Sequence, residues 1–353
     1  YLTRSLWLGP SMLSPMATRI RRQFMRDTRF CPRSEVSSSG RHAWSALLGV
    51  ATLFLAGCAG TLNAVGAGLV YERAEHPVGL AKLDLAYRSD AEADPEKHKL
   101  DLFLPENVAP GWPTLVFVHG GGWTSGDRAT RVLGVEPYRN IGRFYAARGY
   151  GVVVPSYRLQ PDATWQDQVD DVAAAIAFAR QEIARRGGDP NAIHLSGHSA
   201  GAWLAAWVGL EDSALAARGI DRSALCSLVL VSGAGYDPED DETYALGASR
   251  LYFEKRFSTG DDSWAEQTSI RRHLDPSSPP ALVMNAKGEA VTFERQADLL
   301  FGALSEVAPN SERLSVPGLN HQSIVIAMSA DGNLVSDATL RFLARRSCGP
   351  AGA

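Results

Sequence analysis

Residues 192–201 read AIHLSGHSAG, and this stretch decides the fold. The short apolar run Ala192–Leu195 predicts a β-strand, and the small apolar residues that follow Ser199 predict a helix. The pattern G-x-S-x-G between a strand and a helix is typical of a nucleophile elbow, a tight turn that holds the serine hydroxyl above the sheet. Gly197 and Gly201 avoid side-chain clashes in such a turn. The helix also directs its positive end at the serine.

Short β-rich runs alternate with helical patterns on both sides of this stretch. Polar and apolar residues alternate in Lys82–Arg88 and His98–Leu104, as in an antiparallel pair at a sheet edge. The clearest helical pattern runs from Val169 to Ile183. Nearly continuous apolar runs, typical of parallel strands covered on both faces, occur at Thr114–Val118, Gly151–Pro155, Ala192–Leu195, Leu225–Val231 and Ala281–Met284. We predict an α/β fold with a mostly parallel, doubly wound sheet and an antiparallel N-terminal edge.

One segment, at about residues 236–275, interrupts this alternation between two predicted strands. It holds an acidic run at residues 237–242 and scattered aromatic side chains. Long insertions at the carboxyl ends of strands often form lids or substrate caps. We therefore expect a small cap insertion here, and the alternative is a helical excursion that only fills the surface.

A glycine run follows the strand predicted at Thr114–Val118. Residues 119–123 read HGGGW, and glycines there let the main chain approach a bound molecule closely and present N–H groups to it. Together with the N–H of Ala200, the N–H groups of Gly121 and Gly122 are predicted to form an oxyanion hole. The alternative is a flexible loop. The first residue of the motif is expected to be a structural, hydrogen-bonded histidine rather than a base.

Four motifs occur in order along the chain, namely HGGGW at 119–123, SYRL at 156–159, GGDP at 187–190 and GHSAG at 197–201. With these motifs, the sequence resembles α/β-hydrolase esterases of the hormone-sensitive-lipase and feruloyl/acetyl-esterase type over roughly residues 83–345. The resemblance implies the α/β-hydrolase fold and a serine carboxylic-ester hydrolase that acts through an acyl-enzyme on small acyl or aryl esters, without a metal or organic cofactor. Arylformamidases and oligopeptidase-like enzymes are related, so a formamide or a peptide bond is an alternative substrate.

A serine hydroxyl needs a general base, and the chain order in this fold is serine, acid, histidine. Two histidines follow Ser199, namely His273 and His321. His321 comes after the strand-like run Glu312–Val316, where the resembled family has its catalytic histidine. We predict His321 as the base and expect His273 to be structural or to face the substrate.

The acid departs from the family pattern, which has an aspartate in a glycine-containing loop after the penultimate strand. The corresponding loop here reads NAKGEAV at 285–291, and counting back from Gln296 places the acid at Glu289. Glutamate can orient the histidine and stabilise its imidazolium form. Four other carboxylates remain alternatives, with the first of them the best because it follows a strand end: Asp237, Asp275, Glu294 and Asp298.

The first 57 residues differ in composition from the rest of the chain. They hold eight arginines, no lysine and two acidic residues, whereas the remainder holds 27 basic and 37 acidic residues. Residues 43–57 are apolar and uncharged and follow Arg41, as in a secretory signal. LAGC at 55–58 resembles the lipobox of bacterial lipoproteins. This resemblance implies export, lipidation of Cys58 and a membrane anchor in the bacterial envelope, with the outer membrane favoured. An uncleaved anchor, or a signal in which Cys58 is only a small residue, is the alternative.

The whole chain has 353 residues, of which 45% are hydrophobic and 21% charged, so it is neither collagen-like, coiled-coil nor wholly disordered. Its net charge of −4 argues against a nucleic-acid partner. Cys226 is expected to be a small core residue, and a Cys226–Cys348 disulfide is the alternative in an oxidising compartment. No Cys/His cluster has metal-ligand spacing.

The alternative to an enzyme is a non-catalytic envelope lipoprotein built on a hydrolase scaffold. The predicted divisions are a signal at 1–57, a linker at 58–80, a hydrolase domain at 81–347 and a tail at 348–353.

Overall fold

The computed structural model describes most of the chain from residue 76 onwards. The predicted signal segment and tail, together with Cys58 and Cys348, lie outside the described residues and stay predictions. The described residues all lie in the unit Ala56–Ala353, and they are 76–131, 135–211, 213–258 and 260–346.

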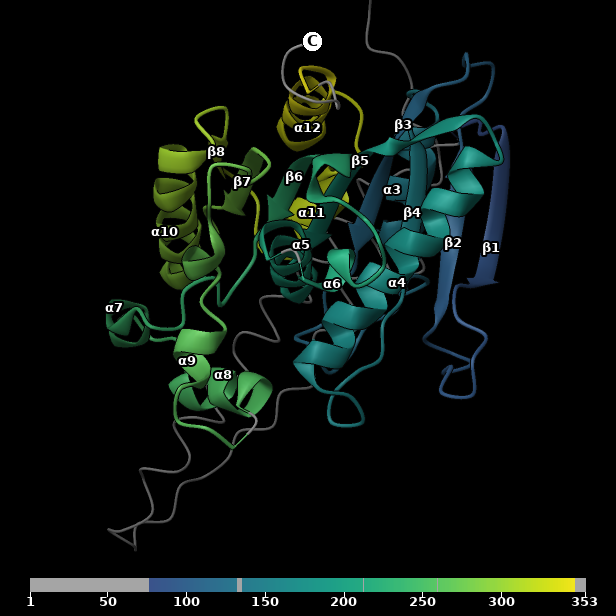
Figure 1. Ribbon diagram of the computed structural model, residues 1–353. Coiled ribbons are helices and arrows are strands. Elements are labelled where there is room, and N and C mark those ends of the chain that lie inside the picture. The colour runs from purple at the N-terminus through teal and green to yellow at the C-terminus, as the bar shows by residue number, and fades with distance from the viewer. Residues whose placement is uncertain (1–75, 132–134, 212, 259, 347–353) are drawn as a thin grey trace, which may run out of the picture. The chain divides into compact units, whose positions relative to one another are not determined.

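An eight-stranded sheet forms the centre of the fold. Its strands are β1 (Leu80–Ala86), β2 (Lys99–Leu104), β3 (Trp112–Val118), β4 (Gly151–Pro155), β5 (Gly188–His198), β6 (Leu225–Val231), β7 (Ala281–Ala286) and β8 (Glu312–Val316). They lie in the order β1-β2-β4-β3-β5-β6-β7-β8, with β1 and β8 at opposite edges (Figure 1). The pairs β1–β2 and β2–β4 are antiparallel, and all the other neighbours are parallel. The predicted mostly parallel sheet with an antiparallel N-terminal edge is confirmed.

The strand that leads to Ser199 begins earlier than predicted. β5 starts at Gly188, whereas the apolar pattern begins at Ala192. The intervening residues have turn composition, but Gly188 pairs with Trp112 on β3. A Cβ on Gly188 would lie 2.5 Å from an atom of the Trp112 ring, so only glycine fits beside it. Packing against the neighbouring strand therefore overrides the local turn signal.

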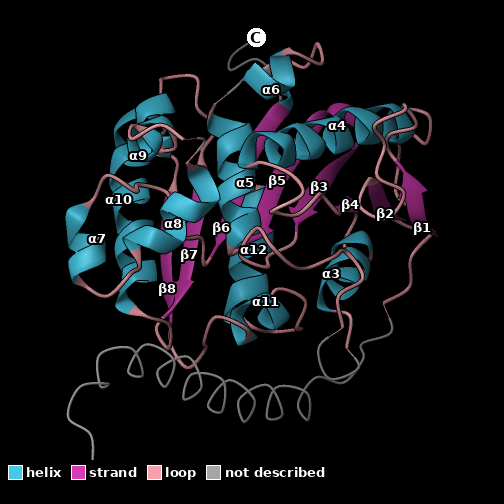
Figure 2. Cartoon of the chain, turned by 90° about the horizontal axis from the view of Figure 1, so that it is seen from below, coloured by secondary structure: helices cyan, strands magenta, loops and turns pink. Residues whose placement is uncertain are grey.

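Helices cover both faces of the sheet. Figure 2 shows α3 (Pro137–Ala146) and α4 (Trp165–Ala184) on opposite sides of the strands. The helices α11 (Ser323–Ala327) and α12 (Leu334–Ala344) share a hydrophobic cluster with α3. The helices α5 (Ala200–Leu210) and α10 (Val291–Val307) share the other cluster with α4. Because both faces are covered, β6 is buried along its whole length. A capping box between Thr164 and Asp167 starts α4. Shorter segments are α6 (Ser213–Ala216) and the 3-10 turn η1 (Arg222–Ala224).

The insertion between β6 and β7 folds as short helical segments. They are α7 (Asp241–Ala245), α8 (Arg250–Phe257), α9 (Trp264–Gln267) and the 3-10 turn η2 (Ile270–His273). Figure 1 shows α7, α8 and α9 together at one end of the sheet, below α10. The side chain of Ser249 caps α8 by accepting a hydrogen bond from the amide of Tyr252.

Four tryptophans form a buried cluster between α5 and the insertion, and we call Trp123, Trp165, Trp203 and Trp207 the tryptophan cluster. The ring centroids of Trp123 and Trp203 lie 6.1 Å apart, and those of Trp165 and Trp203 lie 5.8 Å apart. Phe257, at the end of α8, lies 5.1 Å from Trp123 and 4.7 Å from Trp203. Aromatic pairs contribute about 0.5–1.5 kcal/mol beyond their buried area, so the cluster holds α8 against α5.

Candidate active site

Ser199 stands at the turn between β5 and α5. Its backbone has φ 57° and ψ −124°, a conformation that residues with a side chain rarely adopt. The turn leaves no room for side chains on its two glycines. A Cβ on Gly197 would lie 2.2 Å from the carbonyl oxygen of Gly201, and a Cβ on Gly201 would lie 2.3 Å from that of Val118. The structure thus places Ser199 on a tight strand-to-helix turn of the kind that GHSAG predicts.

Three side chains distant in the sequence meet above the sheet. The Oγ atom of Ser199 lies 3.0 Å from Nε2 of His321, and Nδ1 of His321 lies 2.9 Å from Oε2 of Glu289. They come from the loops that follow β5, β8 and β7, respectively, so the parallel strands deliver all three to one edge. The side chain of Glu289 is only 1% exposed, whereas that of His321 is 24% exposed. This is the hydrogen-bonded order expected of a nucleophile, its general base and an orienting acid.

Two further groups hold the carboxylate of Glu289 in place. The Oε1 atom accepts hydrogen bonds from Oγ of Ser232 at 2.6 Å and from the amide of Ala286 at 2.5 Å. Ser232 follows β6 directly and has φ +50°, a strained value for a residue with a side chain. Both donors bind the oxygen that does not contact His321. They therefore leave Oε2 free to accept the hydrogen bond from Nδ1 of His321.

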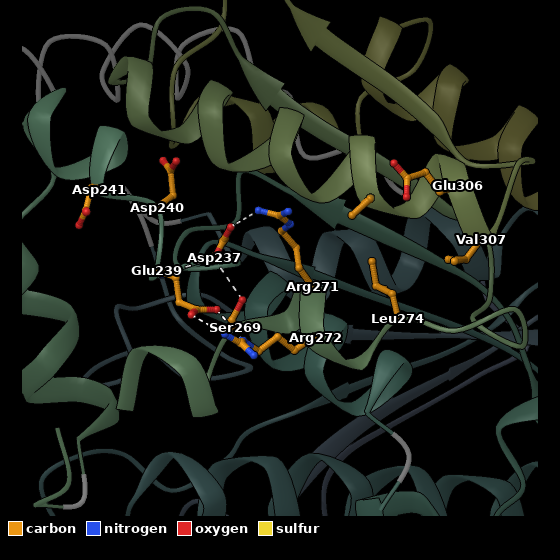
Figure 3. A pocket seen from close by; sticks show the side chains of 11 residues that line it. Asp237, Glu239, Asp240, Asp241, Ser269, Arg271, Arg272, Leu274, Glu306 and Val307 are labelled. Atoms are coloured by element: carbon orange, nitrogen blue, oxygen red, sulfur yellow. Dashed lines mark hydrogen bonds and ion pairs between the residues drawn. The ribbon is translucent and has the colours of Figure 1, made fainter. Parts of the chain in front are cut away.

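The alternative acids all have other partners. Asp237 accepts a hydrogen bond from Ser269 and forms an ion pair with Arg271, in a separate cavity of about 640 Å³ (Figure 3). The remaining three are bound to neighbouring side chains: Asp275 to Arg222, Glu294 to Ser315, and Asp298 to Arg313. Glu289 is thus the carboxylate that the structure brings to His321.

Of two other histidines, His198 contacts His321, whereas His273 packs elsewhere. The Nε2 atom of His198 lies 2.8 Å from the carbonyl oxygen of His321, and the two rings are 4.7 Å apart. Burial, reinforced by His321, lowers the pKa of His198 to about 3. His198 is therefore neutral, and because a carbonyl only accepts, its Nε2 carries the proton. His273 packs against Trp207 with a ring distance of 4.8 Å, as a structural residue does.

The HGGGW loop lies directly beside the elbow. A Cβ on Gly120 would be 3.1 Å from the Cβ of Ser199, so the glycine permits this close approach. Gly121 and Gly122 have φ of +133° and +61°. Within the described part of the chain, the amides of Gly121, Gly122 and Ala200 donate to no protein acceptor. Since Ala200 opens α5, its N–H has no partner inside the helix. These are the three amides predicted to form the oxyanion hole.

Hydrogen bonds to the loop's own carbonyls set the direction of its amides. Nδ1 of His119 lies 2.8 Å from the carbonyl oxygen of Gly120, and burial lowers the pKa of His119 to about 4, so the neutral ring donates. Ser125 donates from Oγ at 2.8 Å and from its amide at 3.0 Å to the carbonyl of Gly121. In a trans peptide the N–H points opposite to the C=O. Anchoring these two carbonyls therefore orients the N–H groups of Gly121 and Gly122.

A cavity of about 740 Å³ opens beside Ser199 and His321. Its walls come from the HGGGW loop, the insertion and the start of α10, and they are more apolar than polar. The insertion supplies Ala248, Ser249, Tyr252 and Phe253, and α10 supplies Thr292, Phe293 and Gln296. Because α8 forms one wall of this cavity, the insertion does more than fill the surface.

A family match agrees with this geometry. Residues 100–304, more than half of the chain, match the model of the BD-FAE family. The chain belongs to the BD-FAE family. This confirms the resemblance to esterases of the hormone-sensitive-lipase type that the motifs indicate.

Curated relatives of this BD-FAE chain include plant and mycobacterial proteins. It is 38% identical over 251 residues to isoprenylcysteine alpha-carbonyl methylesterase ICME of Arabidopsis thaliana, covering 68% of this chain and 57% of that protein. It is 30% identical over 220 residues to esterase LipC of Mycobacterium tuberculosis, covering 59% of this chain and 52% of that protein. The chain thus spans about half the length of these relatives.

Solved structures share the fold of the BD-FAE chain. Esterase B from Lactobacillus rhamnosis superposes with a TM-score of 0.61 at 22% identity, covering 84% of this chain and 94% of that one. A hyperthermophilic esterase from the archaeon Pyrobaculum calidifontis superposes with a TM-score of 0.60 at 18% identity, covering 94% of this chain and 97% of that one. The expected α/β-hydrolase fold is confirmed.

Two kinds of feature are absent from the described residues of the BD-FAE chain. No group of three or more His, Cys, Asp or Glu side chains among them is placed to hold a metal ion. In the same part of the chain, none of the helices combines the length and the apolar character needed to cross a membrane.

Three buried histidines are expected to make this BD-FAE domain less stable as the pH falls. Burial lowers the pKa of His119 and His194 to about 4 and that of His198 to about 3. Below the unfolded pKa of about 6.5, the unfolded chain binds these protons and the folded chain does not. We expect the free energy of unfolding to fall as pH drops from 6.5 towards 4, by about 1.4 kcal/mol per pH unit for each histidine.

Urea unfolding between pH 6.5 and 5 measures this slope before most carboxylates titrate. His194 is the residue to replace, because its Nδ1 contacts Oγ of Ser227 in the core rather than the site. His194→Asn should reduce the slope by about one third, since one of three titrating groups is lost. A stability that is independent of pH in this window contradicts the prediction.

Proposed function

We propose that the chain is a serine carboxylic-ester hydrolase that acts through Ser199, His321 and Glu289. The observation that carries the proposal is the continuous hydrogen-bonded order of these three side chains at the wall of one cavity. The relatives named above are esterases, which supports ester chemistry for this chain. No metal or organic cofactor has a step in this mechanism.

The first stage forms an acyl-enzyme. Oγ of Ser199 attacks the carbonyl carbon of the ester while its proton passes to Nε2 of His321. The amides of Gly121, Gly122 and Ala200 donate to the oxyanion of the tetrahedral intermediate. The bond to the alcohol oxygen then breaks, and His321 returns the proton to that oxygen. Glu289 stabilises the imidazolium throughout and keeps its own charge.

The second stage releases the acid. A water molecule gives a proton to Nε2 of His321 and attacks the acyl carbon, so that a second tetrahedral oxyanion forms in the same place. The bond between that carbon and Oγ of Ser199 breaks, and the proton on His321 returns to Oγ. The chain is thereby restored, and one ester and one water have become one acid and one alcohol.

The cavity walls favour small acyl or aryl esters as substrates. The lining of this cavity includes five aromatic side chains, those of Trp123, Tyr138, Tyr252, Phe253 and Phe293. Such walls bind apolar or aromatic groups by burial and by edge-to-face ring contacts. A volume of about 740 Å³ leaves room for a short acyl chain and one ring.

A chain-length series of p-nitrophenyl esters tests the proposed function. We expect the purified full chain to hydrolyse the acetate and butyrate with kcat/KM at least about tenfold above the palmitate, because a long flexible acyl chain loses more conformational freedom on binding. Arylformamides and peptide p-nitroanilides serve as parallel substrates. Hydrolysis of the formamides alone moves the proposal to an arylformamidase. If no substrate is cleaved and Ser199 resists a fluorophosphonate probe, the chain is a non-catalytic scaffold.

Ser232 provides a test of the acid's position. Ser232→Ala removes one donor from Oε1 of Glu289 and keeps the backbone and the Ala286 amide. We expect kcat to fall about tenfold with KM changed less than about twofold, since a hydrogen bond to a charged group contributes roughly 1.5–3 kcal/mol. Ser269→Ala is the matched control, because Oγ of Ser269 also donates to a buried carboxylate, that of Asp237. Equal losses in both variants contradict the proposed role of Ser232.

We also propose that the chain is exported and anchored through a lipid at Cys58. The apolar run before LAGC supports this. A second support is that Cys226 on β6 is disulfide-bonded, since disulfides persist in oxidising compartments. In a Gram-negative host, the wild-type chain should partition with membranes and incorporate labelled palmitate. Cys58→Ala should abolish the label, and a labelled variant contradicts the proposal.

A further inference from the structure

The third glycine carbonyl of the HGGGW loop is held from outside the loop. His119 anchors the carbonyl of Gly120, and Ser125 anchors that of Gly121. Each of these side chains lies within four residues of the glycine that it holds. The carbonyl of Gly122 instead accepts a hydrogen bond from Nε of Arg256 at 3.2 Å. Arg256 belongs to α8, which lies in the insertion far along the chain. The insertion therefore supplies the last anchor of this loop.

A second side chain of α8 reinforces the same point. Oη of Tyr252 lies 3.5 Å from the carbonyl oxygen of Gly122, and a Cβ on Gly122 would lie 2.7 Å from that hydroxyl. Tyr252 and Arg256 are four residues apart, so they project from one face of α8. The guanidinium of Arg256 lies 4.6 Å from the centre of the Tyr252 ring. Each side chain thus helps to hold the other against the loop.

Arg256 is itself held in place by its backbone and free of competing carboxylates. Its carbonyl accepts a hydrogen bond from Nε2 of Gln160 at 2.7 Å, and the carbonyl of Phe257 accepts one from Nε1 of Trp165 at 2.9 Å. Arg256 is half-buried, and among the described residues no carboxylate forms an ion pair with it. Its Nε–H therefore remains committed to Gly122.

We propose that Arg256 is a positioning residue that aligns the oxyanion hole by holding the carbonyl of Gly122. Gly121 and Gly122 have no side chains, so only their carbonyl contacts fix the path of the backbone. The anchor at Gly121 sets the N–H of Gly122, and the anchor at Gly122 fixes the peptide on its other side. Docking of α8 thereby completes the donor set that Ser199 needs. This inference rests on the proposed function, because it concerns the same oxyanion.

Arg256→Met tests the proposal, since methionine keeps much of the stem and removes the donor. A fluorophosphonate reacts at Ser199 with its phosphoryl oxygen in the oxyanion site, and the ester assay supplies kcat and KM. We expect the second-order labelling rate and kcat to fall together by about 10- to 100-fold, the range for a misplaced donor, with KM changed less than about threefold. Lys255→Met is the matched control, because Lys255 is the exposed neighbour on α8. It should behave as wild type.

Active-site titration separates alignment from folding. A misfolded fraction lowers the burst amplitude and leaves the rate per active site unchanged, and that result overturns the proposal. If Arg256→Met is insoluble, Arg256→Lys provides the readout, because lysine keeps the charge but loses the planar Nε–H. If Arg256→Met and Arg256→Lys both show wild-type labelling rate and kcat per active site, the role of Arg256 is overturned and the proposed function stands. A wild-type chain that the probe does not label overturns the proposed function, and the inference with it.

Discussion

Ser199→Ala should reduce kcat for p-nitrophenyl acetate by about 10⁶-fold, the scale of losing the nucleophile of a triad. Among the described residues, Oγ of Ser199 is the hydroxyl that is hydrogen-bonded to Nε2 of His321, at 3.0 Å, so alanine leaves the base without a nucleophile to activate. Binding should persist, since the cavity walls and the loop amides are unchanged. KM should therefore stay within about threefold of wild type while kcat collapses. Steady-state kinetics on enzyme purified from an esterase-deficient host measures the loss.

Two comparisons make this result specific. Alanine keeps the Cβ at the strained turn, so thermal unfolding of Ser199→Ala should match wild type. Ser196→Ala removes a serine within β5, whose Oγ donates to the carbonyl of Val229 at 2.8 Å in the core. It should lose some stability and keep its kcat. If Ser199→Ala retains more than about one per cent of wild-type kcat, Ser199 is not the nucleophile.

Glu289→Gln should reduce kcat by about 10⁴-fold, because it reverses the tautomer of His321. The amide of Ala286 and Oγ of Ser232 both donate to the Oε1 position, so they will hold the oxygen of the new glutamine there. Its NH2 group then faces Nδ1 of His321 as a donor. The imidazole must carry its proton on Nε2, and it can no longer accept the proton of Ser199.

The alternative acids supply the controls for this variant. Glu294→Gln alters a carboxylate at the start of α10 that bonds to Ser315, and it should leave kcat unchanged. Asp237→Asn breaks the ion pair with Arg271 and should lower the melting temperature more than the turnover. Turnover that depends on Asp237 and is indifferent to Glu289 contradicts the assignment of the acid.

Local sequence predicts the sheet and the chain order of the site well. β4 and β6 occupy the residues that the apolar runs predict, because strands covered on both faces are apolar along their length. GHSAG and HGGGW carry their geometry in their glycines, whose missing side chains allow the turns. The family loop pattern places the acid at Glu289, and the structure brings that residue to His321.

Contacts between distant segments could not be predicted in this way. Ser232 is an unremarkable serine after β6, and its bond to Glu289 depends on how the loops of two strands meet. The donation from His198 to the carbonyl of His321 likewise joins two loops. Arg256 lies in an insertion without a motif, and only the docking of α8 brings its Nε to Gly122. Such pairings arise from tertiary packing, which leaves no periodic trace in the sequence.

The tryptophan cluster gives the molecule a built-in optical reporter. Trp123 follows the loop glycines, and its ring packs edge-on against both Phe257 of α8 and Trp203 of α5. Closely spaced indoles in fixed, asymmetric surroundings produce strong near-ultraviolet circular dichroism, and buried indoles emit at short wavelength. Separating α8 from the loop wets Trp123 and ends its fixed ring contacts. Ellipticity and emission maximum therefore report whether α8 is docked on the loop, without any label attached to the protein.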